Sequence, residues 1–169
     1  MKSASVLFGI TLTMLLGALP APVSAQMGPI SPVYVAVYGV FYLCPYLVRE
    51  AKAPSASGLA KWGFEVSAEG RPGELSFKGT SEKGFLVASF DPTKKRCTVT
   101  YAGGGYEQIS GAVRDTVIGN KFTRVTGGDK DGAKADVFEG TVPKSSATAR
   151  IIIIENYTNK SSSIAYSER

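Results

Sequence analysis

The stretch VYVAVYGVFYLCPYLV, residues 33–48, decides the fold, because it places tyrosine at positions 34, 38, 42 and 46. A spacing of four fits the two-residue period of a strand and also the near-four repeat of a helix. The run of sixteen apolar or aromatic residues is long for a strand. Ser31-Pro32 is a good helix start, and Arg49 and Lys52 suit a helix end. We therefore favour a helix here and keep a strand as the alternative.

The helical interpretation predicts an apolar stripe and a disturbance near its end. Pro45 lacks an amide hydrogen and would collide with the carbonyl of Phe41, so we expect a kink or a break at Cys44. A transmembrane segment is disfavoured, because the run is shorter than about twenty residues and carries four phenols. The stripe that we expect to face inward consists of Val37, Val40, Phe41, Cys44 and Val48.

The tyrosines and the single tryptophan are the candidate binding residues of this chain. A tyrosine stripe usually belongs to a core or its rim, because each ring buries a large apolar body while its hydroxyl reaches water. A concave apolar surface flanked by these rings would instead bind a partner. The candidate surface consists of Tyr34, Tyr38, Tyr42 and Trp62.

The N-terminus predicts export. Lys2 precedes an apolar run from Val6 to Leu16, and Val23-Ser24-Ala25 has the small residues that a signal peptidase recognises. We expect a signal peptide over residues 1–25 and a mature chain of residues 26–169 that is periplasmic or secreted. That chain forms one α+β domain with a polar C-terminal tail. Removal of Lys2 lowers the formal net charge from +5 to +4.

The chain contains two cysteines, Cys44 and Cys97. An even number of cysteines in a small exported protein normally forms disulfides, and here only one pairing exists. Two free thiols, or one thiol bound to a partner, are the alternative. The cysteines lie far apart in sequence and not in a Cys-x-x-Cys pair, so we interpret the bridge as structural and not as a redox site.

The rest of the chain alternates between strand and helix patterns. The segment 84–90, the turn 91–95 and the segment 96–101 predict a hairpin in which Cys97 lies on the apolar face. Ser57 is the expected cap of a short helix before Trp62. Further strands are expected at 74–78, 135–142 and 147–154, and a helix at 107–118.

Two segments are assigned to loops or edges. Residues 126–134 (TGGDKDGAK) are expected to form a polar loop, and Ser163 to Tyr166 could add a last edge strand. The run Ile151 to Ile154 predicts a central strand buried on both faces. No internal repeat is visible. The predicted fold is a small α+β domain in which an antiparallel sheet of about four to five strands packs against two or three helices.

These features resemble a group of small exported proteobacterial proteins of uncharacterised function. The resemblance covers roughly residues 37–155 and depends on Cys44 in an aromatic segment, Gly63-Phe64, and Cys97 and Val99 in a Cys-x-Val strand. It implies a helix for the first segment and a bridge between Cys44 and Cys97. It implies no catalytic residues.

The sequence offers little catalytic chemistry. It contains no histidine, which excludes Ser-His-Asp and Cys-His mechanisms and the usual zinc and copper ligands. Asp129 and Asp131 lie in a glycine-rich stretch but lack the spacing of a calcium loop, so we expect no metal and no cofactor. The carboxylate pairs that could support a glycosidase, if folding joins them, are Glu69 with Glu74 and Glu107 with Asp115.

Two classes of function therefore stay open. The first is a non-catalytic binding protein of the cell envelope, whose partner is a protein, a polymer or a small ligand. The second is a histidine-free hydrolase or lyase that uses a carboxylate pair. Lys94, Lys95 and Arg96 are expected to be a solvated turn, with attraction to anionic envelope polymers as the alternative. Nucleic acid is not expected as a partner outside the cytoplasm. We favour the binding protein, because no constellation of residues requires an enzyme.

Overall fold

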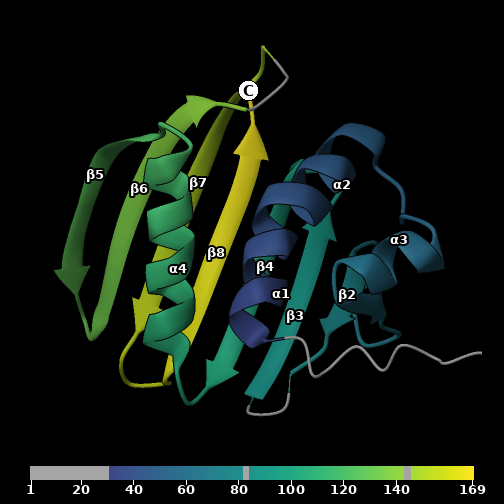
Figure 1. The fold of residues 1–169 in the computed structure, drawn as a ribbon, viewed down its shortest axis with the longest axis horizontal. Coiled ribbons are helices and arrows are strands. Elements are labelled where there is room, and N and C mark those ends of the chain that lie inside the picture. The colour runs from purple at the N-terminus through teal and green to yellow at the C-terminus, as the bar shows by residue number, and fades with distance from the viewer. Residues whose placement is uncertain (1–30, 82–83, 143–145) are drawn as a thin grey trace, which may run out of the picture.

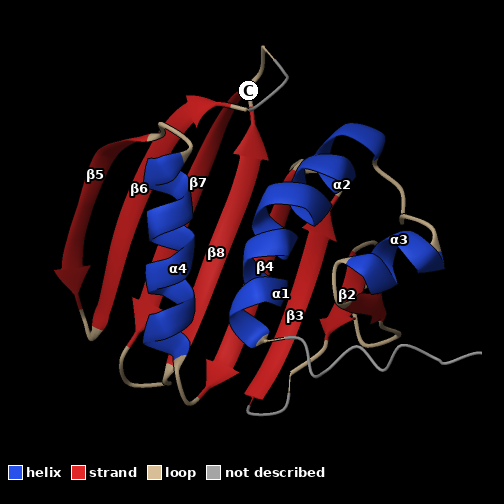
Figure 2. Ribbon diagram, viewed as in Figure 1, coloured by secondary structure: helices blue, strands red, loops and turns tan. Residues whose placement is uncertain are grey.

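The computed structural model describes residues 31–81, 84–142 and 146–169 of the chain. The proposed signal peptide lies outside the described residues. The described part forms one antiparallel sheet with helices on one of its faces (Figures 1 and 2). Its helical elements are α1 (Pro32–Tyr38), a π-helical turn η1 (Gly39–Leu43), α2 (Cys44–Glu50), α3 (Ala56–Lys61) and α4 (Tyr106–Gly119). Its strands are β1 (Phe64–Val66), β2 (Leu75–Gly79), β3 (Gly84–Asp91), β4 (Arg96–Gly103), β5 (Thr123–Lys130), β6 (Ala133–Thr141), β7 (Thr148–Asn156) and β8 (Ser161–Glu168).

Residues 33–48 form a helix, as favoured from the sequence. The helix begins after Ser31 and runs without interruption through α1, η1 and α2. Of the kink or break expected at Cys44, the break is wrong, because Cys44 keeps helical dihedral angles. Its amide donates to the carbonyl of Gly39, five residues earlier, which is the hydrogen bond of a π turn. This wider turn lies where Pro45 would otherwise collide with the preceding carbonyls, so the helix passes through the proline.

The π turn also changes which residues face the core. Val40, Cys44 and Val48 are buried as expected, whereas Val37 and Phe41 are only half-buried. Gly39 brings this helix close to the sheet, because a methyl group there would lie 3.0 Å from the side chains of Phe64 and Val99. The remaining buried positions of the helix are Val35, Ala36, Gly39, Leu43, Pro45 and Leu47.

The sheet has eight strands in the order β1-β2-β3-β4-β8-β7-β6-β5, so the expectation of four to five strands is wrong. The overall α+β architecture is correct. The strands that were not predicted show only a weak sequence pattern. β1 has three residues, and every residue of β5 is exposed, so β5 lacks the alternation of apolar and polar residues. The segment expected to be a polar loop contributes most of β5, which pairs with β6 from Thr123↔Glu139 to Lys130↔Ala133.

The C-terminal segment is more central than expected. β8 pairs with β4 on one side and with β7 on the other, so it is not an edge strand. Ser162, Ile164 and Tyr166 are buried, while Ser163 and Ala165 between them are half-buried. The isoleucine run is central in β7 but buried on one face only, because Ile151 and Ile153 are buried and Ile154 is 38% exposed.

The other predicted elements are found with small shifts. The hairpin β3–β4, the helix α4 and the strands β2, β6 and β7 lie within a few residues of their expected positions. The cap of α3 is Ser55 and not Ser57: the Ser55 hydroxyl oxygen accepts a hydrogen bond of 3.2 Å from the amide of Gly58.

The order of elements repeats, although the sequence shows no repeat. A helix precedes four strands in each half, first α1–α2 with β1–β4 and then α4 with β5–β8. The halves meet where β4 pairs antiparallel with β8. The helices of the two halves also contact each other, because α1 packs against α4 above the centre of the sheet (Figure 1).

Candidate functional site

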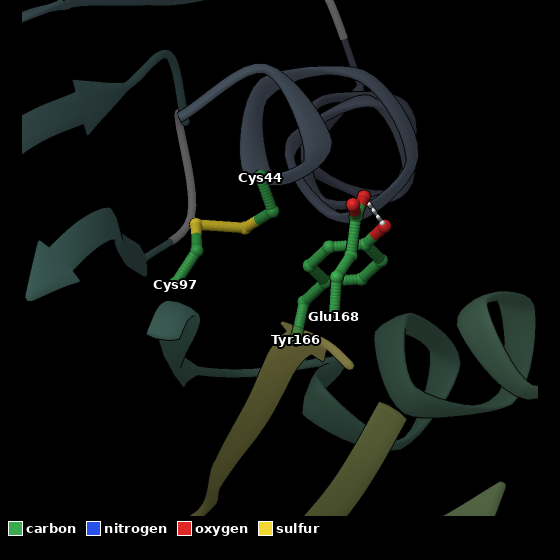
Figure 3. The surroundings of a disulfide bond; sticks show 4 residues. All are labelled: Cys44, Cys97, Tyr166 and Glu168. Carbon is green, nitrogen blue, oxygen red and sulfur yellow. Dashed lines mark hydrogen bonds between the residues drawn. A yellow bond between two sulfur atoms is a disulfide. The ribbon is translucent and has the colours of Figure 1, made fainter. Parts of the chain in front are cut away.

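The predicted disulfide is present between Cys44 of α2 and Cys97 of β4, with their Cα atoms 5.3 Å apart (Figure 3). Both residues are buried in the core. Tyr166 lies opposite Cys97 on β8, and its hydroxyl donates a 2.6 Å hydrogen bond to Glu168. Arg49 of α2 pairs with the same Glu168 carboxylate at 2.8 Å. A covalent bond and an ion pair therefore fix this helix to the two central strands.

Three of the four candidate binding residues form one surface feature. The rings of Tyr34, Tyr38 and Tyr42 stack along the helix, with centroids 4.1 and 4.7 Å apart. We call them the tyrosine column. Tyr34 is 41% exposed and Tyr42 is 51% exposed, and the column lies on the helix side that turns away from its buried residues. Hydrogen bonding to the Tyr38 side chain raises the pKa of Tyr34.

Trp62 does not join the column. It follows α3, packs against the hydrophobic core and lies 6.3 Å from the ring of Tyr46. The three tyrosines form a stack of rings along the helix. Because stacking covers ring faces, the column presents mainly ring edges and hydroxyl groups to a partner.

The predicted carboxylate pairs are placed differently from each other. Glu69 and Glu74 both line a basin of about 520 Å³ on the sheet face that carries no helices. Glu107 lies in the first turn of α4 and Asp115 near the end of this helix, and both are exposed. Only the first pair shares a cavity. The basin is mixed in charge, because Arg71 and Arg96 also line it.

The cationic cluster at residues 94–96 lies in the β3–β4 turn. Lys94 forms a 2.9 Å ion pair with Asp91. The Thr93 hydroxyl and two backbone amides donate to the same carboxylate. These hydrogen bonds hold the pKa of Asp91 well below its ordinary value, and the one from the Thr93 side chain has the largest effect. The charges of Asp91 and Lys94 are therefore paired within the turn itself.

A buried ion network is the main polar feature that sequence reasoning missed. Arg114 of α4 contacts Asp136 of β6 at 3.0 Å and Glu155 of β7 at 2.7 Å. Arg124 of β5 contacts the second oxygen of Asp136 at 2.7 Å. The Asp136 side chain is 4% exposed. Asp136 lies two residues before Phe138 in β6, and this spacing was the available signal, since alternation places Asp136 and Phe138 on one face.

A groove lies beside this network. It has a volume of about 510 Å³ and lies between α4 and the strands β5 and β6. We call it the β5–β6 groove. It is lined by Arg114, Ile118, Phe122, Arg124, Lys134, Asp136 and Phe138.

Two further predictions concern metals and membranes. Asp129 ends up in β5 and Asp131 in the following turn, and among the described residues no group of three or more His, Cys, Asp or Glu side chains could hold a metal ion. The helix Pro32–Glu50 is long and apolar enough to cross a membrane by length and composition. In this structure it packs against the sheet and contributes a large part of the core.

Comparison with protein families, with curated proteins and with solved structures finds no match to this chain.

Proposed function

We propose that this chain is an exported, non-catalytic binding protein that holds a partner of the cell envelope through the tyrosine column. The observation that carries the proposal is the exposure of stacked rings along a rigid helix. Tyrosine is enriched at protein interfaces, because its ring supplies contact area at a low cost in side-chain entropy. Mutual stacking of Tyr34, Tyr38 and Tyr42 restricts the rings further before any partner arrives.

The disulfide supports the export part of the proposal. Stable structural disulfides form in oxidising compartments and are rare in the cytoplasm. The apolar segment before residue 26 has the composition of a signal peptide. A cysteine in an N-terminal helix joined to a Cys-x-Val strand also fits the group of small exported proteobacterial proteins that the sequence resembles. We expect intact-mass analysis of the protein from its native cells to give a chain that begins at Gln26. A mass that retains residues 1–25 would contradict export by this signal.

Binding through the column is tested with substitutions of exposed rings. The mature protein and a Tyr34→Ser/Tyr42→Ser variant are crosslinked in native cells, isolated and analysed by mass spectrometry. Tyr157→Ser is the matched control, because Tyr157 is 44% exposed but lies in the β7–β8 connection. We expect the double variant to recover at least about tenfold less of the partner, since aromatic interface residues often dominate binding. Equal recovery by all three proteins, or no specific partner with wild type, would contradict the proposal.

A hydrolase or lyase that uses carboxylates is the second candidate, because Glu69 and Glu74 line the same basin. Glycoside hydrolysis needs two carboxyl groups on either side of the scissile bond. Turnover of a glycoside that is lost in both Glu69→Gln and Glu74→Gln, but kept in Tyr34→Ser/Tyr42→Ser, would favour this candidate over the binding protein.

A further inference from the structure

The two edges of the sheet are covered differently by helices. In Figure 1, α3 lies beside α1–α2 at the β1 edge, while no described helix lies beside α4 at the β5 edge. α3 packs on β1, and its Leu59 is buried in the core. α4 packs on β7, β8 and β4. The order of elements is otherwise the same in both halves, so the β5–β6 groove occupies the place that corresponds to α3.

Apolar side chains form the floor of this groove. Phe122 packs over Gly140 of β6, where a methyl group would lie 2.6 Å from its ring, and Phe138 is also buried. Ile118 forms part of the wall and is 56% exposed, although it is a large aliphatic residue on a core helix. At the other edge, Leu59 of α3 is buried in the core. The exposed Ile118 is therefore in place to contact one or two aliphatic side chains of an added helix.

The charges of the groove select an acidic occupant. Arg114 and Arg124 are balanced by Asp136 and Glu155, with which they form ion pairs. Lys134 also lines the groove and makes no ion pair with any of the described residues. The Arg124 side chain stays 54% exposed despite its contact with Asp136. Carboxylates on an incoming helix would meet Lys134 and the open side of Arg124.

We propose that the β5–β6 groove binds a short, acidic, amphipathic helix of a partner protein in the place that α3 occupies in the other half. Neither residues 1–30 nor α3 has the composition of such a helix. Residues 1–30 contain no Asp or Glu, and α3 carries Lys61 and no acidic residue. A second copy is also disfavoured, because the chain is basic and the bulge between Arg124 and Thr126 interrupts the free edge of β5.

The proposal is tested by selecting peptides from a displayed random library on the immobilised, oxidised mature protein. We expect enriched peptides to carry Asp or Glu together with aliphatic residues spaced three or four apart. Each enriched peptide is synthesised and its affinity is measured by fluorescence anisotropy. Ile118→Ser and Lys134→Gln are each expected to weaken binding about tenfold, as for a central contact of an interface. Amide shifts in NMR spectra should map to α4, β5 and β6.

Matched controls separate the groove from general effects of charge and apolar surface. Val66→Ser removes a more exposed aliphatic residue, 65% exposed, from the opposite edge, and Lys78→Gln removes an exposed lysine from β2. Both controls and Tyr34→Ser/Tyr42→Ser should bind the peptides as wild type does, so failure of the tyrosine column and failure of the groove are distinguishable. Peptides without acidic residues, equal binding by the groove variants, absence of enrichment, or dimerisation that Ile118→Ser abolishes would each overturn the proposal.

Discussion

The two halves of the sheet attach their helices by different chemistry. The N-terminal half uses the covalent bond between Cys44 and Cys97 in addition to the ion pair between Arg49 and Glu168. The C-terminal half uses Arg114 of α4, which contacts two carboxylates from two strands. Both attachments place a helix on the same face of one sheet. The disulfide is fully buried in the core, whereas the ion network borders an open groove.

The difference has a physical origin in hydration. Thiols and disulfides are readily buried, and Cys44 and Cys97 have no exposed surface. A guanidinium that holds two carboxylates loses less solvation energy when one side meets water, and the Arg114 side chain is 23% exposed. The C-terminal half therefore needs an opening beside its network. We infer that this opening is the reason why the β5–β6 groove lies beside the network.

The largest expected effect comes from the covalent attachment. The bridge closes a sequence separation of 53 residues, for which the chain-entropy model gives an upper value of about 4 kcal/mol. We expect the Cys44→Ala/Cys97→Ala variant to lose up to about 4 kcal/mol in its free energy of unfolding, measured by denaturant titration. Reductant should destabilise wild type and leave the variant unchanged. If oxidised wild type and variant unfold at the same denaturant concentration, the bridge does not stabilise the N-terminal half.

Loss of Arg114 should have the next largest effect. Arg114→Met leaves Asp136 and Glu155 without the guanidinium that joins them, and Asp136 still contacts Arg124. A fully buried pair broken in this way costs about 3 to 5 kcal/mol. Because Arg114 is partly exposed, we expect about 2 kcal/mol in the free energy of unfolding.

A compensating variant sharpens this test. Arg114→Met/Asp136→Asn/Glu155→Gln removes the charge imbalance, so it should recover part of the stability lost in Arg114→Met. If the triple variant is no more stable than the single variant, uncompensated charge is not the cause of the loss. The network would then act through packing of the arginine side chain.

Much of the fold could be predicted from the sequence because its signals are local. The helix over residues 33–48 follows from the length of an apolar run, and the β3–β4 hairpin follows from alternation around a turn. The alternation also placed Cys97 on the buried face, where it meets Cys44. The strand count could not be predicted, because β5 has no buried residue and gains its order from hydrogen bonds to β6.

The candidate site was predictable only in part. A spacing of four along a helix brings Tyr34, Tyr38 and Tyr42 together, so the tyrosine column follows from the helix itself. Trp62 was grouped with them by residue type, and the fold places it beside Tyr46 instead. The ion network joins residues 114, 124, 136 and 155 from four elements, and such an arrangement depends on strand order.

The smallest expected effect concerns the contact between the halves at β4 and β8. Tyr166 is 2% exposed, and its hydroxyl donates to Glu168, which also holds Arg49. Tyr166→Phe removes this hydrogen bond, so we expect a loss of about 1 kcal/mol in the free energy of unfolding at neutral pH. Tyr42→Phe is the control, because the exposed Tyr42 ring should change stability little.

The pH dependence of the same variant tells a buried hydrogen bond from simple packing. Burial, with the hydrogen bond to Glu168, raises the pKa of Tyr166 above its ordinary value of 10.0. The contribution of Tyr166 is therefore complete below pH 10.0 and is lost as the pH rises further, because only the unfolded chain ionises readily there. Above this pH the stability of wild type should fall toward that of Tyr166→Phe, followed by circular dichroism. A constant difference between the two proteins across the alkaline range would mean that the phenol contributes through packing alone, and that Glu168 is held in place by Arg49 of the helix and not by its neighbour on β8.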